Sequence, residues 1–210
     1  MIITFTIIAI TCLVSFLAFN DPARKAQLIF VPALVKNRGE TYRFLTHGFI
    51  HADIMHLVFN MYALYIFGGS AEYTFKLMFG TSFGGAAYLL FYLASIVAAS
   101  LIVYSRHQDN YGYSALGASG AVAAVMWPFI MLAPWNWFIF PPLPAWLLGI
   151  GYVVYSHYAD QRGGSRIGHN AHLWGAIFGL VVYTALAAVL APEILQHFWV
   201  EFLQPKGPNF

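Results

Sequence analysis

Charged side chains are scarce in this sequence. Only 9% of its 210 residues are Asp, Glu, Lys or Arg, whereas 60% are hydrophobic. A soluble domain of this length carries roughly 25% charged residues, so the deficit excludes an ordinary soluble protein and indicates a membrane protein. The formal net charge of +2 is too small to indicate nucleic acid as a partner.

Cysteine and long hydrophilic stretches are also missing. The single cysteine, Cys12, lies in the first apolar run, which excludes a disulfide framework and a cysteine-based zinc site. Because no hydrophilic stretch is long enough to form a second domain, we expect one membrane domain over residues 1–210. The N-terminus lacks the basic region and the cleavage site of a secretory signal, so we expect a retained first helix.

Long apolar runs predict membrane helices. A helix needs about 20 apolar residues to cross a bilayer, with a usual range of about 17–25. Six segments fit this description, at about 2–19, 54–71, 77–104, 115–133, 145–158 and 171–191. The sequence therefore predicts an all-α membrane protein with a bundle of six transmembrane helices.

The segments between the predicted helices are unequal. The first loop, residues 20–53, mixes large apolar side chains with charges, which predicts a structured element associated with the membrane surface. Lys and Arg are concentrated on the side of this loop, and the positive-inside rule alone would place it in the cytoplasm. The tail, about residues 204–210, is expected to be disordered.

Ser119 stands in Gly117-Ala118-Ser119-Gly120, where an apolar run begins. The flanking glycines leave its hydroxyl uncrowded, and free N–H groups at a helix N-terminus suit an oxyanion. Small residues are also common where membrane helices simply pack together. Taken alone, the pattern favours packing.

His172 opens the last predicted span. Ala171, Gly175 and Gly179 recur there every four residues and form a smooth stripe on one helix face, which allows a very close neighbour. A histidine bonded to a backbone carbonyl inside the bundle is one interpretation of His172.

A second stripe runs through Gly120 and Ala124 on the predicted helix 115–133. Close packing of the two stripes would bring Ser119 Oγ within hydrogen-bond reach of His172, and these are a nucleophile and a base for acyl transfer. No acidic residue occurs near the middle of either helix, so a triad has no third member and a dyad is expected.

Histidines are concentrated before and at the start of the second predicted helix. His56 and Asn60 are four residues apart, share one helix face, and both donate hydrogen bonds as an oxyanion hole requires. His47 and His51 have the spacing of helical metal ligands, but Asp53 is the one carboxylate beside them, and we expect no metal. A polar network that ties the first loop to the next helix is the remaining interpretation.

Together these motifs resemble the rhomboid family of intramembrane serine proteases. The matching residues occur in the family's order along most of the chain: Glu40-x-Tyr42-Arg43, His47, His51, His56-x-x-x-Asn60, Gly117-x-Ser119-Gly120 and Ala171-His172-x-x-Gly175-x-x-x-Gly179. A single motif would be weak evidence, whereas this ordered set is highly specific.

The resemblance implies a site and its partners. Ser119 would be the nucleophile and His172 the general base and acid, with His56, Asn60 and the Ser119 N–H as the oxyanion hole. It implies no cofactor, and its partners would be the bilayer and single-pass transmembrane substrates. Support of the first loop and helix packing would fall to Arg43, His47, His51, Gly117, Gly120, Gly175 and Gly179.

The resemblance also bears on location. The family places the first loop outside the cytoplasm. We follow that orientation because the positive-inside rule applies poorly to a folded loop at the membrane interface. We expect a multi-pass protein of a bacterial inner membrane.

Two substitutions depart from the family pattern. Tyr42 stands where the family usually has tryptophan. Ala123 stands where bacterial members often have a tyrosine that supports the catalytic histidine, so support for His172 must come from elsewhere. The short predicted helix 145–158, with Gly149 and Gly151, is suited to the gate that the family's fifth helix forms.

Two other classes of protein compete with a protease. A catalytically inactive relative would bind membrane helices, and loss of Ser119 or His172 would have indicated it. A histidine-based metal protein would depend on His47 and His51, respond to chelators, and be indifferent to Ser119→Ala.

Overall fold

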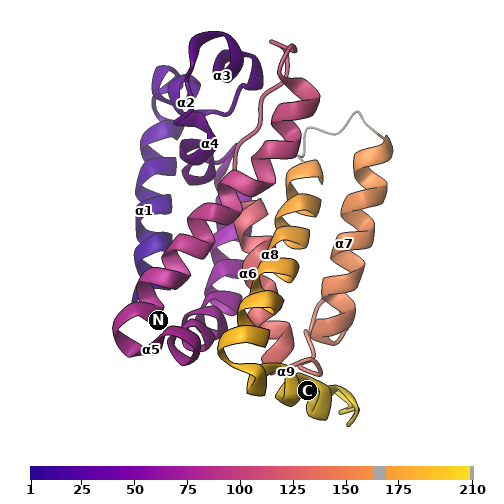
Figure 1. Ribbon diagram of the computed structural model, residues 1–210. Coiled ribbons are helices and arrows are strands. Elements are labelled where there is room, and N and C mark those ends of the chain that lie inside the picture. The colour runs from indigo at the N-terminus through magenta and orange to yellow at the C-terminus, as the bar shows by residue number, and fades with distance from the viewer. Residues whose placement is uncertain (163–168, 209–210) are drawn as a thin grey trace.

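The computed structural model describes residues 1–162 and 169–208 and shows an all-α bundle (Figure 1). The expected class, an all-α membrane bundle with a folded first loop, is confirmed. In chain order the helices are α1 Ile2–Phe19, α2 Pro22–Leu28, α3 Pro32–Arg38, α4 Arg43–Thr46, the 3-10 helix η1 His47–Phe49, α5 Ile54–His107, α6 Ser119–Leu132, α7 Ala145–Arg162, α8 His169–Leu190 and α9 Pro192–Phe202.

The helices have the lengths and surfaces of membrane spans. Among the described residues, α1, α5 and α8 are each long and apolar enough to cross a bilayer. α5 has 54 residues and folds back on itself, so it supplies two passes. Large apolar side chains that are at least half exposed cover the outside of the bundle, as lipid contact requires, among them Ile2, Phe5, Leu13, Phe59, Leu90 and Val181.

The two arms of α5 meet at Gly80 and not at residues 72–76, where the sequence predicted a break. Gly80 has φ +75° and ψ 165°, a conformation that residues with a side chain rarely adopt. The predicted break was wrong because Glu72 and Lys76 pair along the helix at 3.0 Å, which removes the penalty of two charges in an apolar run.

Glu72 also positions α1 against the first arm of α5. Its carboxylate is 2% exposed and accepts hydrogen bonds from the backbone N–H groups of Ile2 at 3.0 Å and Thr4 at 3.1 Å. These are free donors at a helix N-terminus, where negative charge is favourable. A buried carboxylate therefore serves as the cap of a neighbouring helix.

Several predicted boundaries need correction. The helix expected at 77–104 continues to His107, and the one expected at 115–133 ends at Leu132. The helix expected at 115–133 begins only at Ser119, because Gly117 has φ +116° and Ala115 forms an antiparallel bridge with Phe30. The helix expected at 145–158 continues to Arg162, and the last span is His169–Leu190 instead of 171–191.

The chain after the last span is also more regular than expected. Pro192 begins a further amphipathic helix, α9, which the sequence did not predict. In the tail that was expected to be disordered, the Lys206 carbonyl accepts a hydrogen bond from Trp137 Nε1 at 2.8 Å. Residues 209–210 of that tail lie outside the described residues.

The first loop is a folded unit made of α2, α3, α4 and η1. Phe30 is fully buried and packs with Val35 of α3 and Val103 near the end of α5. Arg43 is 4% exposed and donates to the carbonyls of Ala26 at 2.9 Å and Ile29 at 2.6 Å, beside the C-terminus of α2. A cation that satisfies free carbonyls at a helix end stabilises that end.

The Tyr42 departure from the family pattern is accommodated in the same unit. Arg43 Nε donates to Glu40 at 2.5 Å, and the hydrogen bond from the guanidinium lowers the pKa of the Glu40 carboxyl. The guanidinium carbon lies 5.4 Å from the centroid of the Tyr42 ring, a cation–π contact. Tyrosine therefore supplies the aromatic face beside Arg43.

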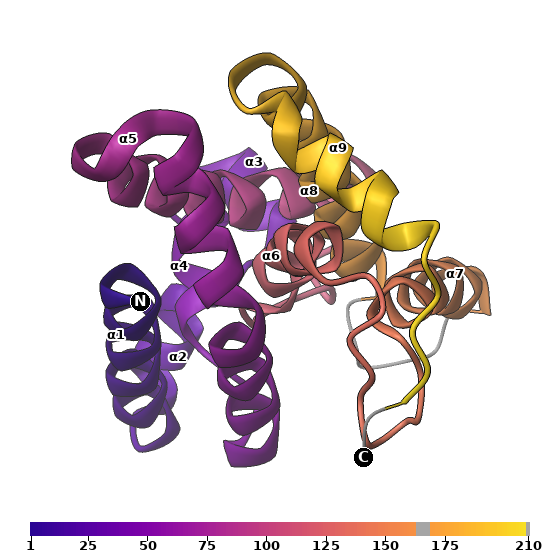
Figure 2. The same cartoon turned by 90° about the horizontal axis from the view of Figure 1, so that it is seen from below.

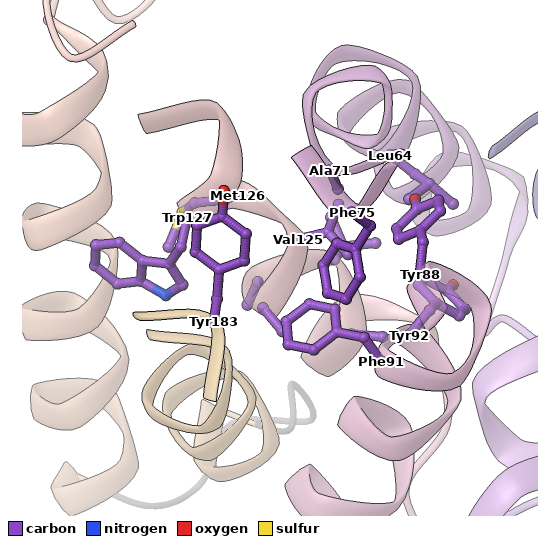
Figure 3. Packing of buried hydrophobic residues seen from close by; sticks show 14 of the residues in the cluster. Leu64, Ala71, Phe75, Tyr88, Phe91, Tyr92, Val125, Met126, Trp127 and Tyr183 are labelled. Carbon is purple, nitrogen blue, oxygen red and sulfur yellow. The ribbon is translucent and has the colours of Figure 1, made fainter. Parts of the chain in front are cut away.

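α6 lies at the centre of the bundle, with α1 and α7 on opposite sides (Figure 2). Its 14 residues are mostly buried, since α5 and α8 pack against it. Figure 3 shows the main cluster, in which Phe75 and Phe91 of α5 lie 5.1 Å apart between ring centroids, with Tyr183 of α8 beside them. This core fixes α6, and Ser119 is its first residue.

Candidate active site

The backbone before Ser119 takes a form that only glycine tolerates. Gly117 has φ +116°, and its N–H donates to the His47 carbonyl at 2.9 Å. A Cβ placed on Gly117 would lie 2.8 Å from His56 Cε1 and 2.9 Å from His56 Nε2. The glycine therefore allows the turn into α6 and makes room for the His56 imidazole beside it.

α6 and α8 touch backbone to backbone along the two small-residue stripes. A Cβ on Gly175 would overlap the carbonyl oxygen of Gly120, and one on Gly179 would overlap Cα of Ala124. A Cβ on Gly120 would lie 3.2 Å from the Ala171 carbonyl oxygen. Such close approach is what small residues permit between membrane helices.

This contact brings together the residues next to the two predicted catalytic side chains. Gly120 follows Ser119, and Ala171 precedes His172, so the first turns of both helices lie side by side. Farther along the same interface, Trp127 Nε1 donates to the Ala176 carbonyl at 2.8 Å. The hydrogen bond between Ser119 Oγ and the His172 imidazole stays a prediction. The close contact of the two helices favours it.

His56 is oriented by its own neighbours. Its backbone N–H donates to Asp53 at 2.8 Å, which caps the start of α5. Its Nδ1 accepts the Ala52 N–H at 3.4 Å, so in neutral His56 the proton is on Nε2, the nitrogen that faces Gly117. His56 thus points a donor at the turn before Ser119.

Asn60 lies one helical turn after His56 and is 7% exposed. Its Nδ2 donates to the His56 carbonyl at 2.9 Å, which fixes the orientation of the amide. The second N–H of an amide group can serve another acceptor. Its place in an oxyanion hole stays a prediction.

His51 links the turn before Ser119 to α1. It is fully buried, and its Nε2 accepts the Ala118 N–H at 3.4 Å. Ser15 Oγ donates to the Phe49 carbonyl at 3.0 Å, so it accepts the proton of His51 Nδ1 at 2.9 Å. Burial lowers the pKa of His51 to about 3, which keeps the ring neutral.

His47 forms a parallel link to the second arm of α5. Its Nδ1 donates to the Arg43 carbonyl at 2.8 Å, so its Nε2 accepts from Ser100 Oγ at 3.1 Å. Burial lowers the pKa of His47 to about 4. Both ring nitrogens of His47 and of His51 thus have protein partners. Within residues 1–162 and 169–208, no three His, Cys, Asp or Glu side chains gather as a metal site requires.

The sequence did not indicate the partners that hold these histidines. Ser15 and Ser100 are buried polar side chains inside apolar helices, and such residues are costly in a membrane unless they are satisfied. That cost was the signal available in the sequence. It marks a residue as important, but it does not say which partner the residue meets.

The His172 ring lies against an aromatic ring of α7. The centroids of His172 and Tyr152 are 5.9 Å apart, and the ring planes differ by 23°. Ala123, the position on α6 where a supporting tyrosine is often found, is 4% exposed and offers only a methyl group. The aromatic neighbour of His172 thus comes from a helix that the sequence gave no reason to choose.

The sequence also matches known proteins. The profile of the Rhomboid domain matches residues 38–189, which include the first loop from the end of α3 onward and most of α8. The mitochondrial RHOMBOID-like protein 12 of Arabidopsis thaliana is 33% identical over 158 residues, which are 70% of this chain and 47% of that protein.

Two further relatives come from a bacterium and from man. Rhomboid protease GlpG of Haemophilus influenzae is 26% identical over 73% of this chain and 74% of its own length. The human mitochondrial Presenilin-associated rhomboid-like protein is 28% identical over 79% of this chain and 43% of its own length. The chain thus spans about half of the two mitochondrial relatives. By the profile match over most of its length, the chain belongs to the rhomboid family.

Proposed function

We propose that the protein is an intramembrane serine endopeptidase that cleaves transmembrane segments through a dyad of Ser119 and His172. The observation that carries this proposal is the backbone contact of α6 and α8, where Gly120 lies against Ala171 and Gly175. Glycine at these positions is costly in a helix unless close approach is needed. Here it sets the first turns of the two helices side by side, which supports a dyad of Ser119 and His172.

In the first half of the reaction, Ser119 Oγ attacks the carbonyl carbon of the scissile peptide bond. His172 accepts the hydroxyl proton as the new C–O bond forms, and the carbonyl oxygen becomes an oxyanion. The tetrahedral intermediate then collapses, the C–N bond breaks, and His172 returns its proton to the departing amine. The product is an acyl ester on Ser119.

The oxyanion is stabilised by donors around the start of α6. The Ser119 N–H is free at the helix N-terminus, His56 Nε2–H faces the preceding turn, and Asn60 Nδ2 has a second N–H. Removing one such donor costs about 2.7–4 kcal/mol of transition-state stabilisation in other serine proteases.

In the second half, a water molecule replaces the amine. His172 takes a proton from this water as its oxygen attacks the ester carbon, and the same donors hold the new oxyanion. Collapse returns the proton to Ser119 Oγ and releases the carboxylic acid. The histidine thus acts alternately as base and acid, and no cofactor takes part.

The substrates we propose are single-pass transmembrane proteins, cut near the bilayer edge. The start of α6 lies beside the first loop, since the Gly117 N–H donates to the His47 carbonyl. We propose a bacterial inner membrane as the location. The mitochondrial names of two relatives make a mitochondrial membrane the alternative, which localisation of the tagged protein would decide.

A fluorophosphonate probe tests the proposal, because it labels only a serine activated by a base. The detergent-solubilised wild type should be labelled, whereas Ser119→Ala and His172→Ala should not be, with their melting temperatures little changed. Asn60→Ala should be labelled more slowly, because the other donors remain.

The control is Gly207→Ala, at a position after the end of α9 where an added Cβ meets nothing within 4 Å. It should be labelled at the wild-type rate. No labelling of well-folded wild type would overturn the proposal in favour of an inactive relative that binds membrane helices. If a chelator abolished labelling and Ser119→Ala left it unchanged, a metal protein would be favoured.

A further inference from the structure

We propose that Tyr152 of α7 is the positioning residue for His172, and that α7 thereby controls whether the base is correctly oriented. This inference rests on the proposed function. The carrying observation is the near-parallel packing of the two rings, with centroids 5.9 Å apart and planes 23° from each other. The rings come from different helices, so the contact depends on how α7 lies against α8.

The position on α6 where a supporting ring is often found offers no ring here. Ala123 lies one turn after Ser119 on α6 and presents a buried methyl group. The torsion that turns an imidazole about its own bond to Cβ is broad, so a histidine needs a neighbour to hold its ring plane. A flat ring packed on one face supplies that restraint.

The tyrosine ring also favours the state of His172 that exists during the reaction. When His172 takes the proton of Ser119 it becomes a cation, and the face of an aromatic ring attracts a cation. The neutral resting ring gains less from the same contact. Tyr152 therefore stabilises the transition state more than the ground state, which is the condition for raising a rate.

The position of α7 is set at both ends of the helix. Near its start, a Cβ on Gly149 would overlap the Ile130 side chain of α6, so the two helices are in close contact there. Near its end, Asp160 accepts from Arg106 of α5 at 2.8 Å and from Asn170 of α8 at 3.3 Å.

Tyr152 lies between these two contacts. Both contacts involve side chains. One of them is a partly exposed ion pair, in which the Arg106 side chain is 49% exposed and that of Asp160 is 20% exposed. A displacement of α7 would therefore move the Tyr152 ring away from His172 while α6 and α8 stay together.

The test is the rate of inactivation of the full-length protein in detergent by a fluorophosphonate, measured over a range of probe concentrations. This separates the maximal rate of inactivation from the half-saturating concentration. Tyr152→Ala should lower the maximal rate about tenfold, which corresponds to about 1.4 kcal/mol. The half-saturating concentration should change by less than about twofold, because Tyr152 acts on the base and not on the probe.

Tyr152→Phe is the conservative variant, and it should keep more than about half of the wild-type maximal rate because the ring remains. Val154→Ala is the matched control, since Val154 is 61% exposed on another face of the same helix. It should behave as wild type. If Tyr152→Ala does not fold, Tyr152→Leu fills the space without an aromatic face and should show the same loss.

The outcomes separate this inference from the proposed function. Absence of labelling in the wild type would overturn both. Normal labelling of wild type together with a normal maximal rate in folded Tyr152→Ala or Tyr152→Leu would overturn the positioning role alone. An equal loss in Tyr152→Phe and Tyr152→Ala would also overturn it, because the hydroxyl and not the ring would then be responsible.

Discussion

The two helices that flank α6 are held in different ways. α8 meets α6 through backbone, with Gly175 against Gly120 and Gly179 against Ala124. α7 meets α6 and α5 at points that involve side chains, where Gly149 lies against the Ile130 side chain and Asp160 pairs with Arg106. Backbone contacts cannot relax by changing a rotamer, whereas side-chain contacts can.

This difference separates two tasks within one site. The contact of α6 with α8 sets the distance between the start of one helix and the start of the other, which a nucleophile and its base must keep constant. The contact of α7 with α8 places a ring against His172. We therefore expect damage at the first contact to abolish activity and damage at the second to modulate it.

The largest effect is expected from Gly175→Val. A Cβ at this position would overlap the Gly120 carbonyl oxygen, and a backbone atom cannot move aside, so the helices must separate. We expect a loss of about 3 kcal/mol or more in the free energy of unfolding, the upper end of what overpacking costs. Fluorophosphonate labelling should fall at least a hundredfold, because about 1.4 kcal/mol of lost alignment already costs tenfold.

Thermal unfolding in detergent and labelling kinetics measure the two effects. Gly207→Ala is the control, because a Cβ added at this glycine meets nothing within 4 Å. It should change neither the stability nor the labelling rate. Wild-type labelling by Gly175→Val would show that the contact of α6 with α8 does not set the alignment of the dyad.

Acid should destabilise the first-loop side of the site. Folding lowers the pKa of His47 to about 4 and that of His51 to about 3, from 6.5 for both, because both rings are buried. The unfolded chain therefore takes up protons first as the pH falls below about 6.5. The stability is fully present above that pH and declines progressively towards pH 4 and below.

The melting temperature in detergent, measured from pH 7.5 to pH 4, checks this. His47→Gln and His51→Gln each remove one titrating ring and keep an amide that can bond, so each variant should show a shallower decline than wild type. Asp53 and His56 lie beside His51 and are unchanged in both variants. An identical decline in all three proteins would assign the acid sensitivity to other groups.

Much of this fold follows from local patterns. Apolar runs predicted the spans, and the four-residue spacing of Ala171, Gly175 and Gly179 predicted the close helix pair, because a helix repeats its surface every three to four residues. The order of the motifs predicted the family. These features depend on residues that are near one another in the chain.

The features that the sequence did not predict depend on residues far apart. Glu72 appeared to end a helix, yet it caps α1 and pairs with Lys76. The neighbour of His172 could not be chosen among the 13 tyrosines of the chain until α7 was placed beside α8. α9 was missed because an 11-residue amphipathic helix is too short for the length test that identifies a span.

The smallest effect is expected from Asp160→Asn, at the end of α7. This change removes the charge that pairs with Arg106 at 2.8 Å, and a partly exposed pair contributes at most about 1 kcal/mol, so the melting temperature should hardly move. Labelling by a small probe should stay within about twofold of wild type, because the contact of Gly149 with Ile130 still holds the part of α7 that carries Tyr152, and the contact of α6 with α8 is untouched. Cleavage of a transmembrane substrate should rise by about three- to fivefold, because a whole helix must pass α7 and the end of α7 is no longer held. A loss of up to about 1 kcal/mol of holding energy corresponds to that factor. Arg106→Gln removes the other partner and should reproduce the result, whereas Lys36→Gln breaks an exposed ion pair with Asp109 elsewhere and should not. Equal effects on the small probe and on the membrane substrate would mean that the ion pair of Asp160 acts on the dyad through Tyr152 alone, and a separate effect of α7 on substrate entry would then be refuted.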